Sequence, residues 1–459
     1  MSDIFRAYDI RGKYPGEINK KAACLIGQAF VDFLKEKTKA KRPLIVVGRD
    51  KRASSTPLFK SLARGLKSQK AKVISIGEVP TDAFYFAFKY FKAGGGIMIT
   101  ASHNPSKWNG FKMIVKSHGF VCQGQGMEKL KSKIRKAPTG SRQRRQQKSE
   151  THIKDAKIES KNIIPSYLNH ILKMAKKLEI QGVPKLFKIG VEFLGGVAFK
   201  VIKPLVKKFS LKTVCLNSST HSFDPLLPKN LRELSKVIRN KKLDFGIAFD
   251  GDGDRIIFLD EKGKLVDPSS ILALLSLYFM EEWPHSKIVY NLVCSKVVRE
   301  EIKSHGGVPI RTRVGHVFIK KIAEKKKAAF GGEHSGHYFF KENGYSECSA
   351  LVLLLMLKIL SDKKKRLSEL IEPLKRYFKG GEINLPLHQD AEKIYKKITS
   401  HFKGGKIDYL DGLTIEFKDW WFNLRESQTE PLFKLTIEAK NKRAFLEKKK
   451  AIFSILFSL

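Results

Sequence analysis

The chain has 459 residues, a length typical of about three domains with hydrophobic cores of their own. Its formal net charge of +43 suits anionic partners such as nucleic acid, anionic lipid or phosphorylated small molecules. Because the basic residues stand in short scattered runs, and no zinc-finger, RNP or zipper signature is present, the sequence argues against specific reading of nucleic acid.

The five cysteines are widely spaced and odd in number, so neither a disulfide framework nor a zinc site is indicated. The N-terminus lacks the zones of a secretion signal, and the longest uncharged apolar stretch, near 268–280, is too short to cross a bilayer as a helix. We therefore expect a soluble cytoplasmic protein without a membrane partner. We also expect a monomer, and the sequence leaves an oligomer open.

The first third of the chain alternates short β-branched strands with amphipathic helices. We expect strands at 44–47, 73–76 and 97–99, and helices at about 57–67 and 83–92. Such βαβ units build mainly parallel sheet.

A lone serine follows the third of these strands, in the run 100–105, Thr-Ala-Ser-His-Asn-Pro. We expect Pro105 to begin a helix, whose free N–H groups would favour an anion near Ser102. A phosphate carried by Ser102, flanked by His103, is therefore one interpretation. A serine that only caps the helix is the alternative.

The polar, basic stretch 138–148 is typical of a linker, and the alternation resumes after it. The second cycle has expected strands at 188–191, 213–216 and 244–249, with helices at 196–209 and 230–241. The third cycle has expected strands at 288–290, 308–310 and 328–330, with helices at 269–282, 296–305 and 317–326. The last part of the chain has an expected helix at 390–402, strands at 407–409, 413–417 and 432–438, and a terminal helix from 441.

The run 250–255, Asp-Gly-Asp-Gly-Asp-Arg, sets three carboxylates at alternate positions between glycines that allow a tight curl. Several hard oxygen ligands suit Mg²⁺ or Ca²⁺. The spacing nearly matches an EF-hand loop, since Glu261 stands where the last ligand belongs, but Arg255 replaces the required glycine. The flanking segments are typical of strands, so we expect a metal site at a strand end; a structural acidic turn is the alternative.

Further clusters hold groups that suit phosphate or sugar. Arg11, in the run 8–12, has a guanidinium that can grip phosphate, and Lys112 could stabilise charge on a phosphoryl group, although a surface lysine is the alternative. The loop 331–337, Gly-Gly-Glu-His-Ser-Gly-His, offers acid, base and hydroxyl groups to a sugar, with a plain Gly-Gly turn as the alternative.

Two weaker motifs complete the set. His316, after Gly315, is either a site residue or a structural histidine. The run 425–431, Arg-Glu-Ser-Gln-Thr-Glu-Pro, contains the ingredients of a phosphate cradle, with a polar hairpin loop as the alternative.

The pattern of elements predicts an α/β protein, with three consecutive α/β domains of mixed, βαβ-based sheet followed by a smaller α+β domain around a central cleft. The expected boundaries are 1–150 with the Ser102 loop, 151–254 ending in the aspartate run, 255–375 with the Glu333 loop, and 376–459 with the Arg425 loop.

Taken together, the run 5–12, the Ser102 run, the aspartate run, the Glu333 loop and the Arg425 loop resemble those of the α-D-phosphohexomutases, in the same order along the chain. The opening run, with Ala7-Tyr8-Asp9, is more similar to the bacterial phosphomannomutase/phosphoglucomutase branch than to phosphoglucosamine mutases, which usually begin with Gly-Thr-Asp-Gly.

This resemblance implies an isomerase of carbohydrate metabolism whose partner is a small sugar phosphate. A phosphate on Ser102 passes to a hexose 1-phosphate of mannose or glucose, the 1,6-bisphosphate turns over, and the other phosphate returns to Ser102; the bisphosphate also serves as activator. The resemblance implies that Mg²⁺ is bound by Asp250, Asp252, Asp254 and the Ser102 phosphate, and that the transferring group is supported by Arg11, His103, Lys112 and Arg255. It implies that the sugar is bound by Glu333 and Ser335, in a cleft lined by His316 and His337. The non-reacting phosphate would be bound by Arg425, Ser427, Gln428 and Thr429, with Tyr8.

The chain departs from the family pattern at three positions. Gln428 replaces the usual asparagine and Lys434 a frequent arginine, which concerns the grip on phosphate. Val293 stands where related enzymes carry a lysine, which concerns the choice of sugar. A phosphoglucosamine mutase and a non-catalytic polyanion-binding protein stay open as alternatives.

Overall fold

The computed structural model describes residues 4–116, 118–135, 158–180, 187–217, 223–386, 390–427 and 432–457. The chain divides into two compact units, one formed by Met1–Ile257 and Ser349–Leu354 and the other by Phe258–Cys348 and Leu355–Leu459. The linker expected at 138–148 lies outside the described residues.

The first sheet has the strand order β1-β5-β4-β2-β3-β7, with β6 paired to β5. These strands are β1 Ile10–Lys13, β2 Leu44–Arg49, β3 Lys72–Glu78, β4 Gly95–Ile99, β5 Trp108–Val115, β6 Gly119–Phe120 and β7 Glu159–Ser160. The β2–β3, β2–β4 and β3–β7 pairs are parallel, whereas β5 is antiparallel to both β4 and β1. The sheet is therefore mixed, with its parallel part built from the expected βαβ units.

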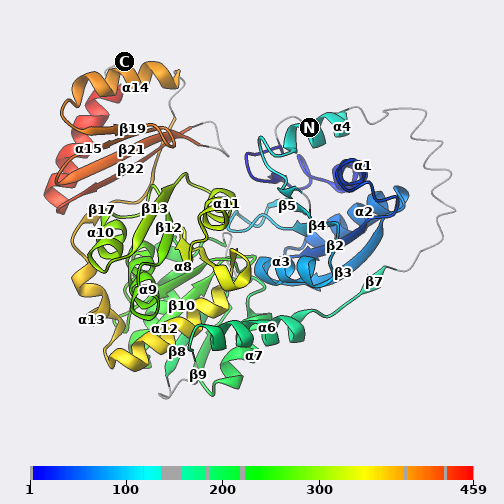
Figure 1. Ribbon diagram of the computed structural model, residues 1–459, viewed down its shortest axis with the longest axis horizontal. Coiled ribbons are helices and arrows are strands. Elements are labelled where there is room, and N and C mark those ends of the chain that lie inside the picture. The colour runs from blue at the N-terminus through cyan, green and yellow to red at the C-terminus, as the bar shows by residue number, and fades with distance from the viewer. Residues whose placement is uncertain are drawn as a thin grey trace. The chain divides into compact units, whose positions relative to one another are not determined.

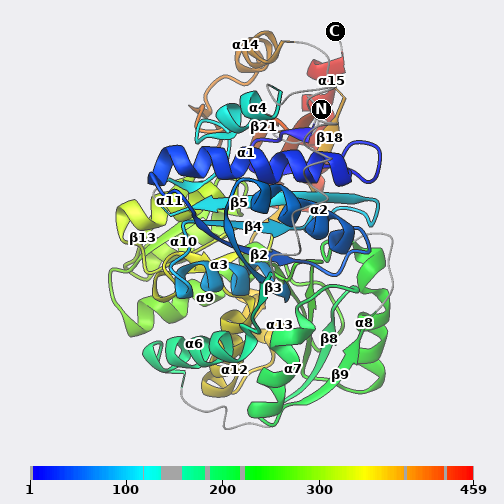
Figure 2. The same ribbon diagram turned by 90° about the vertical axis from the view of Figure 1, so that its right-hand side faces the viewer.

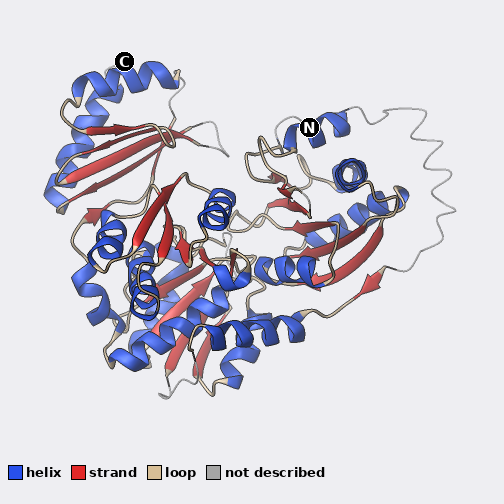
Figure 3. Ribbon diagram, viewed as in Figure 1, coloured by secondary structure: helices blue, strands red, loops and turns tan. Residues whose placement is uncertain are grey.

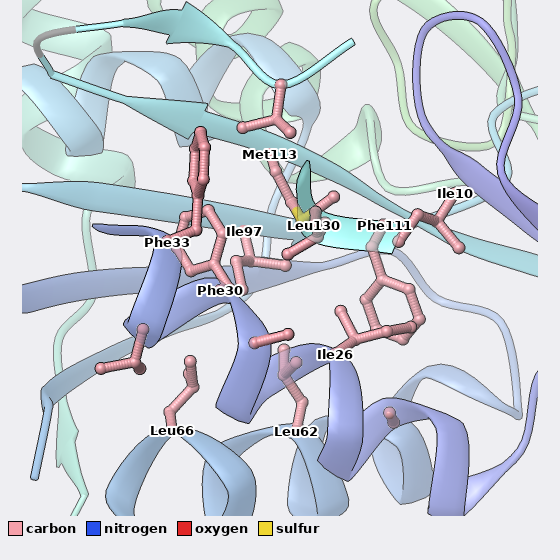
Figure 4. Packing of buried hydrophobic residues seen from close by; sticks show 14 of the residues in the cluster. Ile10, Ile26, Phe30, Phe33, Leu62, Leu66, Ile97, Phe111, Met113 and Leu130 are labelled. Atoms are coloured by element: carbon pink, nitrogen blue, oxygen red, sulfur yellow. The ribbon is translucent and has the colours of Figure 1, made fainter. Parts of the chain in front are cut away.

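Helices cover both faces of this sheet (Figures 1 and 2). The glycines of β4 mark the two faces: a Cβ on Gly95 would meet Phe30 and Leu34 of α1, Lys20–Thr38, whereas a Cβ on Gly96 would meet Phe84 of α3, Thr81–Tyr90. On the first face, α1 packs with α2, Ser55–Ser68, and with α4, Met127–Arg135. Figure 4 shows the buried side chains of this layer, including Ile26, Phe30, Leu62, Ile97 and Phe111.

The second sheet has the order β11-β10-β8-β9, with β8 parallel to both β10 and β9. Its strands are β8 Lys188–Glu192, β9 Lys212–Leu216, β10 Phe245–Phe249 and β11 Ile256–Leu259. Helices α6, Ile164–Lys177, α7, Phe199–Lys208, and α8, Pro228–Asn240, accompany it. Leu234 and Ile238 of α8 pack over Gly190 and Gly246, where a larger residue would leave no room for the helix.

The second unit begins with a sheet in the order β13-β12-β14-β15-β16. Its strands are β12 Lys287–Asn291, β13 Val308–Thr312, β14 Phe330–Gly332, β15 Tyr338–Phe340 and β16 Ser346–Glu347. The accompanying helices are α9 Pro268–Glu282, α10 Lys296–Ser304, α11 His316–Lys326, α12 Ser349–Lys363 and α13 Leu367–Ile371.

The last domain is an antiparallel sheet with one helix between β18 and β19 and another at its C-terminal end (Figure 3). Its strands are β17 Phe378–Lys379, β18 Ile383–Leu385, β19 Lys406–Asp408, β20 Leu413–Glu416, β21 Trp420–Glu426 and β22 Phe433–Ala439, and its helices are α14 Ala391–His401 and α15 Lys442–Phe457. The sequence reading missed β21. The predicted class, three α/β domains followed by an α+β domain, is confirmed. Within the described part of the chain, we find no helix of sufficient length and apolar character to cross a membrane.

Two glycines bring the backbones of α1 and α2 close together. A Cβ on Gly65 would lie 2.1 Å from the carbonyl oxygen of Cys24, and one on Gly27 would lie 2.6 Å from that of Leu62. Both distances are well inside van der Waals contact, so the helices have to separate if either residue gains a side chain.

We therefore expect Gly65→Ala to destabilise the first unit by about 1–3 kcal/mol, measured as a lower temperature of its thermal unfolding. Gly16→Ala is the matched control, because nothing lies within 4 Å of the Cβ it would add. Equal unfolding temperatures for the two variants would show that the helix contact is not as tight as described.

Candidate active site

Ser102 lies in the turn that joins β4 to β5. The strand β4 ends at Ile99 and β5 begins at Trp108, and the two pair in antiparallel fashion. The expectation of a helix beginning at Pro105 is therefore wrong, because the chain turns back into the sheet at this point. Among the described residues no helix N-terminus lies at this turn, so Ser102 is not a helix cap and the alternative of a helix-capping serine is wrong as well.

The backbone and hydroxyl of Ser102 are both held. Its φ of +50° is in the left-handed region, which costs a non-glycine residue about 1–2 kcal/mol. The Ser102 N–H donates to Thr100 Oγ1 at 2.8 Å, and the hydroxyl donates to Asp250 Oδ2 at 2.7 Å. Nδ1 of His103 lies 3.4 Å from the hydroxyl oxygen. The resemblance implied that Ser102 and the three aspartates share one site, and the structure brings the Ser102 hydroxyl into contact with Asp250.

Arg52, a buried residue, also holds this turn, and it was not expected from the sequence. Its guanidinium donates to the carbonyl oxygens of Ser102 at 2.6 Å and Asn104 at 2.8 Å, and also to those of Pro105 and Trp108. Asp50 accepts from Arg52 Nε at 3.0 Å. The one indication in the sequence was the position of Asp50 and Arg52, which follow the expected strand 44–47 at its carboxyl end, where open α/β sheets bind ligands.

The three aspartates follow β10 and converge. Asp250, Asp252 and Asp254 are buried, and one oxygen of each lies within 4.8 Å of the others. Thr81 donates to Asp252 Oδ2 at 2.7 Å, while Asp252 Oδ1 has no hydrogen-bond partner among the described residues. Burial, together with the charges of Asp252 and Asp254, raises the pKa of Asp250 well above its usual range.

Lys112 neutralises part of this charge. Its Nζ, on β5, lies 2.7 Å from Asp252 Oδ2 and 2.7 Å from Asp254 Oδ2. Burial alone would lower the pKa of Lys112, but the two carboxylates raise it well above its usual range. The alternative of a surface lysine is therefore wrong, because this ammonium group is buried within the acidic cluster.

Two arginines lie next to the cluster. Arg255 approaches Asp250, with Nε 3.8 Å from Oδ2, and this Nε has no hydrogen-bond partner among the described residues. Arg11 donates to Asp9 and to Asn104, each at 2.5 Å. Asp9, Asp252 and Asp254 together raise the pKa of Arg11, although its burial acts in the other direction.

The donor set fits a divalent cation. Three buried carboxylates face the Lys112 ammonium and the Arg255 guanidinium, so carboxylates outnumber these cations, and one oxygen of Asp252 has no hydrogen-bond partner among the described residues. Oxygen ligands at this density are those that Mg²⁺ prefers. The expected positions of the ligands and of Ser102 thus come together in the first unit.

The second unit contains the Glu333 loop, between β14 and β15. Glu333 is buried and accepts hydrogen bonds from the Gly315 N–H at 3.0 Å, from the Asn291 amide at 3.2 Å and from the Ser335 hydroxyl at 3.2 Å. Nδ1 of His337 lies 3.1 Å from Glu333 and 2.8 Å from the Ser335 hydroxyl. Burial alone would raise the pKa of Glu333, but His337, the Gly315 N–H and the Asn291 amide lower it. Glu333 is therefore a carboxylate at neutral pH.

His316 belongs to the same region, since its ring centroid lies 6.4 Å from that of His337. The sequence reading missed Asn291, at the carboxyl end of β12, which fixes one oxygen of Glu333. This contact joins the end of β12 to the loop after β14, 42 residues further along the chain, so it can be recognised only from the fold.

Arg425 stands apart, on β21 of the last domain. Its side chain donates to Asn423 Oδ1 at 3.0 Å and to the carboxylate of Glu382. Ser427 follows at the end of the strand, with its N–H donating to the Leu432 carbonyl at 2.7 Å. Gln428 and Thr429 lie outside the described residues, and Tyr8 is partly buried in the first unit.

Comparison with protein families agrees with this arrangement. Residues 2–140, 165–263 and 267–377 match the families described as phosphoglucomutase/phosphomannomutase, alpha/beta/alpha domains I, II and III, respectively.

Full-length relatives and a solved structure extend the match. The phosphomannomutase of Methanocaldococcus jannaschii is 34% identical over 99% of this chain and 98% of its own length. The phosphomannomutase of Escherichia coli K12 is 31% identical over 96% of each chain. A crystal structure of a phosphoglucomutase/phosphomannomutase family protein from Burkholderia thailandensis superposes with a TM-score of 0.84 at 26% identity, covering 100% of this chain and 98% of that one. The chain therefore belongs to the phosphoglucomutase/phosphomannomutase family of phosphosugar mutases.

Proposed function

We propose that this protein interconverts the 1- and 6-phosphates of mannose and glucose through a phosphate carried on Ser102. The oxygen of the free sugar hydroxyl attacks the phosphorus, the bond from phosphorus to Ser102 breaks, and the hydroxyl proton ends on the serine oxygen. The sugar then carries two phosphates, and the reverse step returns the other one to Ser102. Atoms and charge balance over the cycle, with the hexose 1,6-bisphosphate as intermediate.

The observation that carries this proposal is the 2.7 Å hydrogen bond between the Ser102 hydroxyl and Asp250. It joins residues 148 positions apart, so the turn and the aspartate run serve one purpose. Phosphoryl transfer depends mainly on positioning and on neutralisation of charge. Arg52 fixes the backbone of the serine turn, and the left-handed φ presents the hydroxyl to the aspartates.

Asp250, Asp252 and Asp254 would hold Mg²⁺, which when bound draws negative charge away from the transferring phosphoryl group. Lys112 holds its positive charge beside Asp252 and Asp254, close to the serine. In the proposal Arg11, His103 and Arg255 face the oxygens of the transferring phosphate. These residues bind and orient; none of them has to form a covalent bond.

The second unit would bind the rest of the substrate. Glu333 is ionised and is oriented by Gly315 and Asn291, so it can accept hydrogen bonds from sugar hydroxyls, with Ser335 beside it. His316 and His337 complete this region in the proposal. Arg425 and Ser427, with Gln428, Thr429 and Tyr8, would hold the phosphate that does not react.

We also propose that the four domains span residues 1–150, 151–254, 255–375 and 376–459. We propose in addition that the enzyme is a monomer. The five cysteines are free, which agrees with a reducing compartment such as the cytoplasm.

Purified protein with Mg²⁺ and a trace of glucose 1,6-bisphosphate should convert mannose 1-phosphate and glucose 1-phosphate to the corresponding 6-phosphates. Rates on mannose, glucose and glucosamine phosphates, measured side by side, identify the substrate class. Fastest turnover of the glucosamine phosphate would indicate a phosphoglucosamine mutase instead, and no turnover of any of the three would contradict the proposed activity.

Replacement of the carrier hydroxyl should stop the reaction. We expect Ser102→Ala to lower kcat at least about a hundredfold, because alanine has no hydroxyl to carry the phosphate. Ser106→Ala is the control, because Ser106 is an exposed residue later in the same turn. This variant should convert the substrate at the rate of the unchanged protein. A Ser102→Ala enzyme with near-normal kcat would rule out the phosphoserine route.

A further inference from the structure

Glu382 bridges two cations of the last domain. It lies between β17 and β18, directly after Gly380 and Gly381. One of its carboxylate oxygens accepts from the guanidinium of Arg425, and the other lies 2.7 Å from Nζ of Lys434. A single carboxylate therefore serves both positive groups.

The pairing of β21 with β22 brings two positive side chains together, which favours an anion between them. Arg425 on β21 and Lys434 on β22 are directly opposite each other in the antiparallel register. Like charges at such a pair repel, because their side chains leave the same face of the sheet close together. The Arg425 side chain is only 6% exposed, so water screens this repulsion poorly. The two cations thus form an anion site whose occupant in this structure is Glu382.

Glu382 is the movable member of the group. Its side chain is 35% exposed, against 6% for Arg425, which is also fixed by Asn423. Gly380 packs closely against the Phe445 ring, but the space beside Gly381, directly before Glu382, is open, since nothing lies within 4 Å of a Cβ there. Burial would raise the pKa of Glu382, but Arg425 and Lys434 lower it, so the group stays charged at neutral pH.

We propose that Glu382 is the internal counter-ion of this anion site and that a phosphate group of the substrate displaces it when it binds Arg425 and Lys434. Carboxylate and phosphate offer a guanidinium the same paired oxygen acceptors, so one can replace the other. The inference rests on the proposed function, in which Arg425 holds the non-reacting phosphate. Glu382 then sets the affinity for phosphate, and hence how readily the product leaves.

The test compares the unchanged protein with Glu382→Gln, which keeps the shape and an acceptor oxygen but removes the charge. Calorimetric titration with inorganic phosphate should give a dissociation constant about fivefold lower for Glu382→Gln. KM for the hexose 1-phosphates should fall by a similar factor, without a rise in kcat. Glu447→Gln is the matched control: Glu447 is an exposed glutamate of the same domain, paired with Lys448, and should leave both constants unchanged.

An unchanged or weaker affinity of Glu382→Gln for phosphate would overturn the proposal, because it would mean that Glu382 only orients Arg425. Absence of measurable phosphate binding in both proteins would overturn it as well. The calorimetric comparison does not require turnover. A protein inactive on every hexose phosphate would contradict the proposed function and still leave the role of Glu382 decided by the titration.

Discussion

Three buried carboxylates that face one ammonium group and one hydroxyl are the constraint on which the first unit depends. Charges taken out of water are tolerated only where opposite charges or hydrogen-bond donors surround them. Lys112, on a strand of the first sheet, supplies a positive charge to these carboxylates, and Thr81, on a helix that packs against the sheet, donates a hydrogen bond to them. The carboxyl end of β10 and the turn after β4 are thereby tied together, although 148 residues separate Ser102 from Asp250.

The same constraint explains why the serine turn is so strongly held. In the proposed reaction the Ser102 hydroxyl accepts and gives up a phosphate, so it has to stay in place while the charge beside it changes. Arg52 donates to several carbonyl oxygens of the turn, and Thr100 fixes the N–H of Ser102. The backbone strain at Ser102 persists because these contacts leave the residue no relaxed alternative. In the second unit, Glu333 and Arg425 show the same principle, since each is oriented by buried polar neighbours.

Residues whose chemistry is visible in a short run could be predicted from the sequence. The strands at 97–99 and 244–249 and the spacing of the three aspartates pointed to the serine turn and to the aspartate run. The helix expected after Pro105 was wrong, because hydrogen bonding of β5 to two neighbouring strands outweighs the local preference of proline for a helix start.

The contacts that the sequence did not reveal are all long-range. Arg52 reaches a turn 50 residues away, Asn291 reaches Glu333 over 42 residues, and Glu382 reaches Arg425 over 43. Strand β21, Trp420–Glu426, was missed, and its last two residues were instead assigned to the run 425–431 interpreted as a phosphate cradle. In each case the role of the residue depends on which strands become neighbours, and a local pattern does not contain that information.

In the proposed mechanism, Ser102 carries the phosphate beside the aspartate cluster. The most direct measurement is transfer of radiolabelled phosphate from glucose 1,6-bisphosphate to the protein, with and without Mg²⁺, followed by peptide mapping. We expect label on the peptide that contains Ser102, dependent on Mg²⁺. Label on another residue, or catalysis without any labelled Ser102, would contradict it.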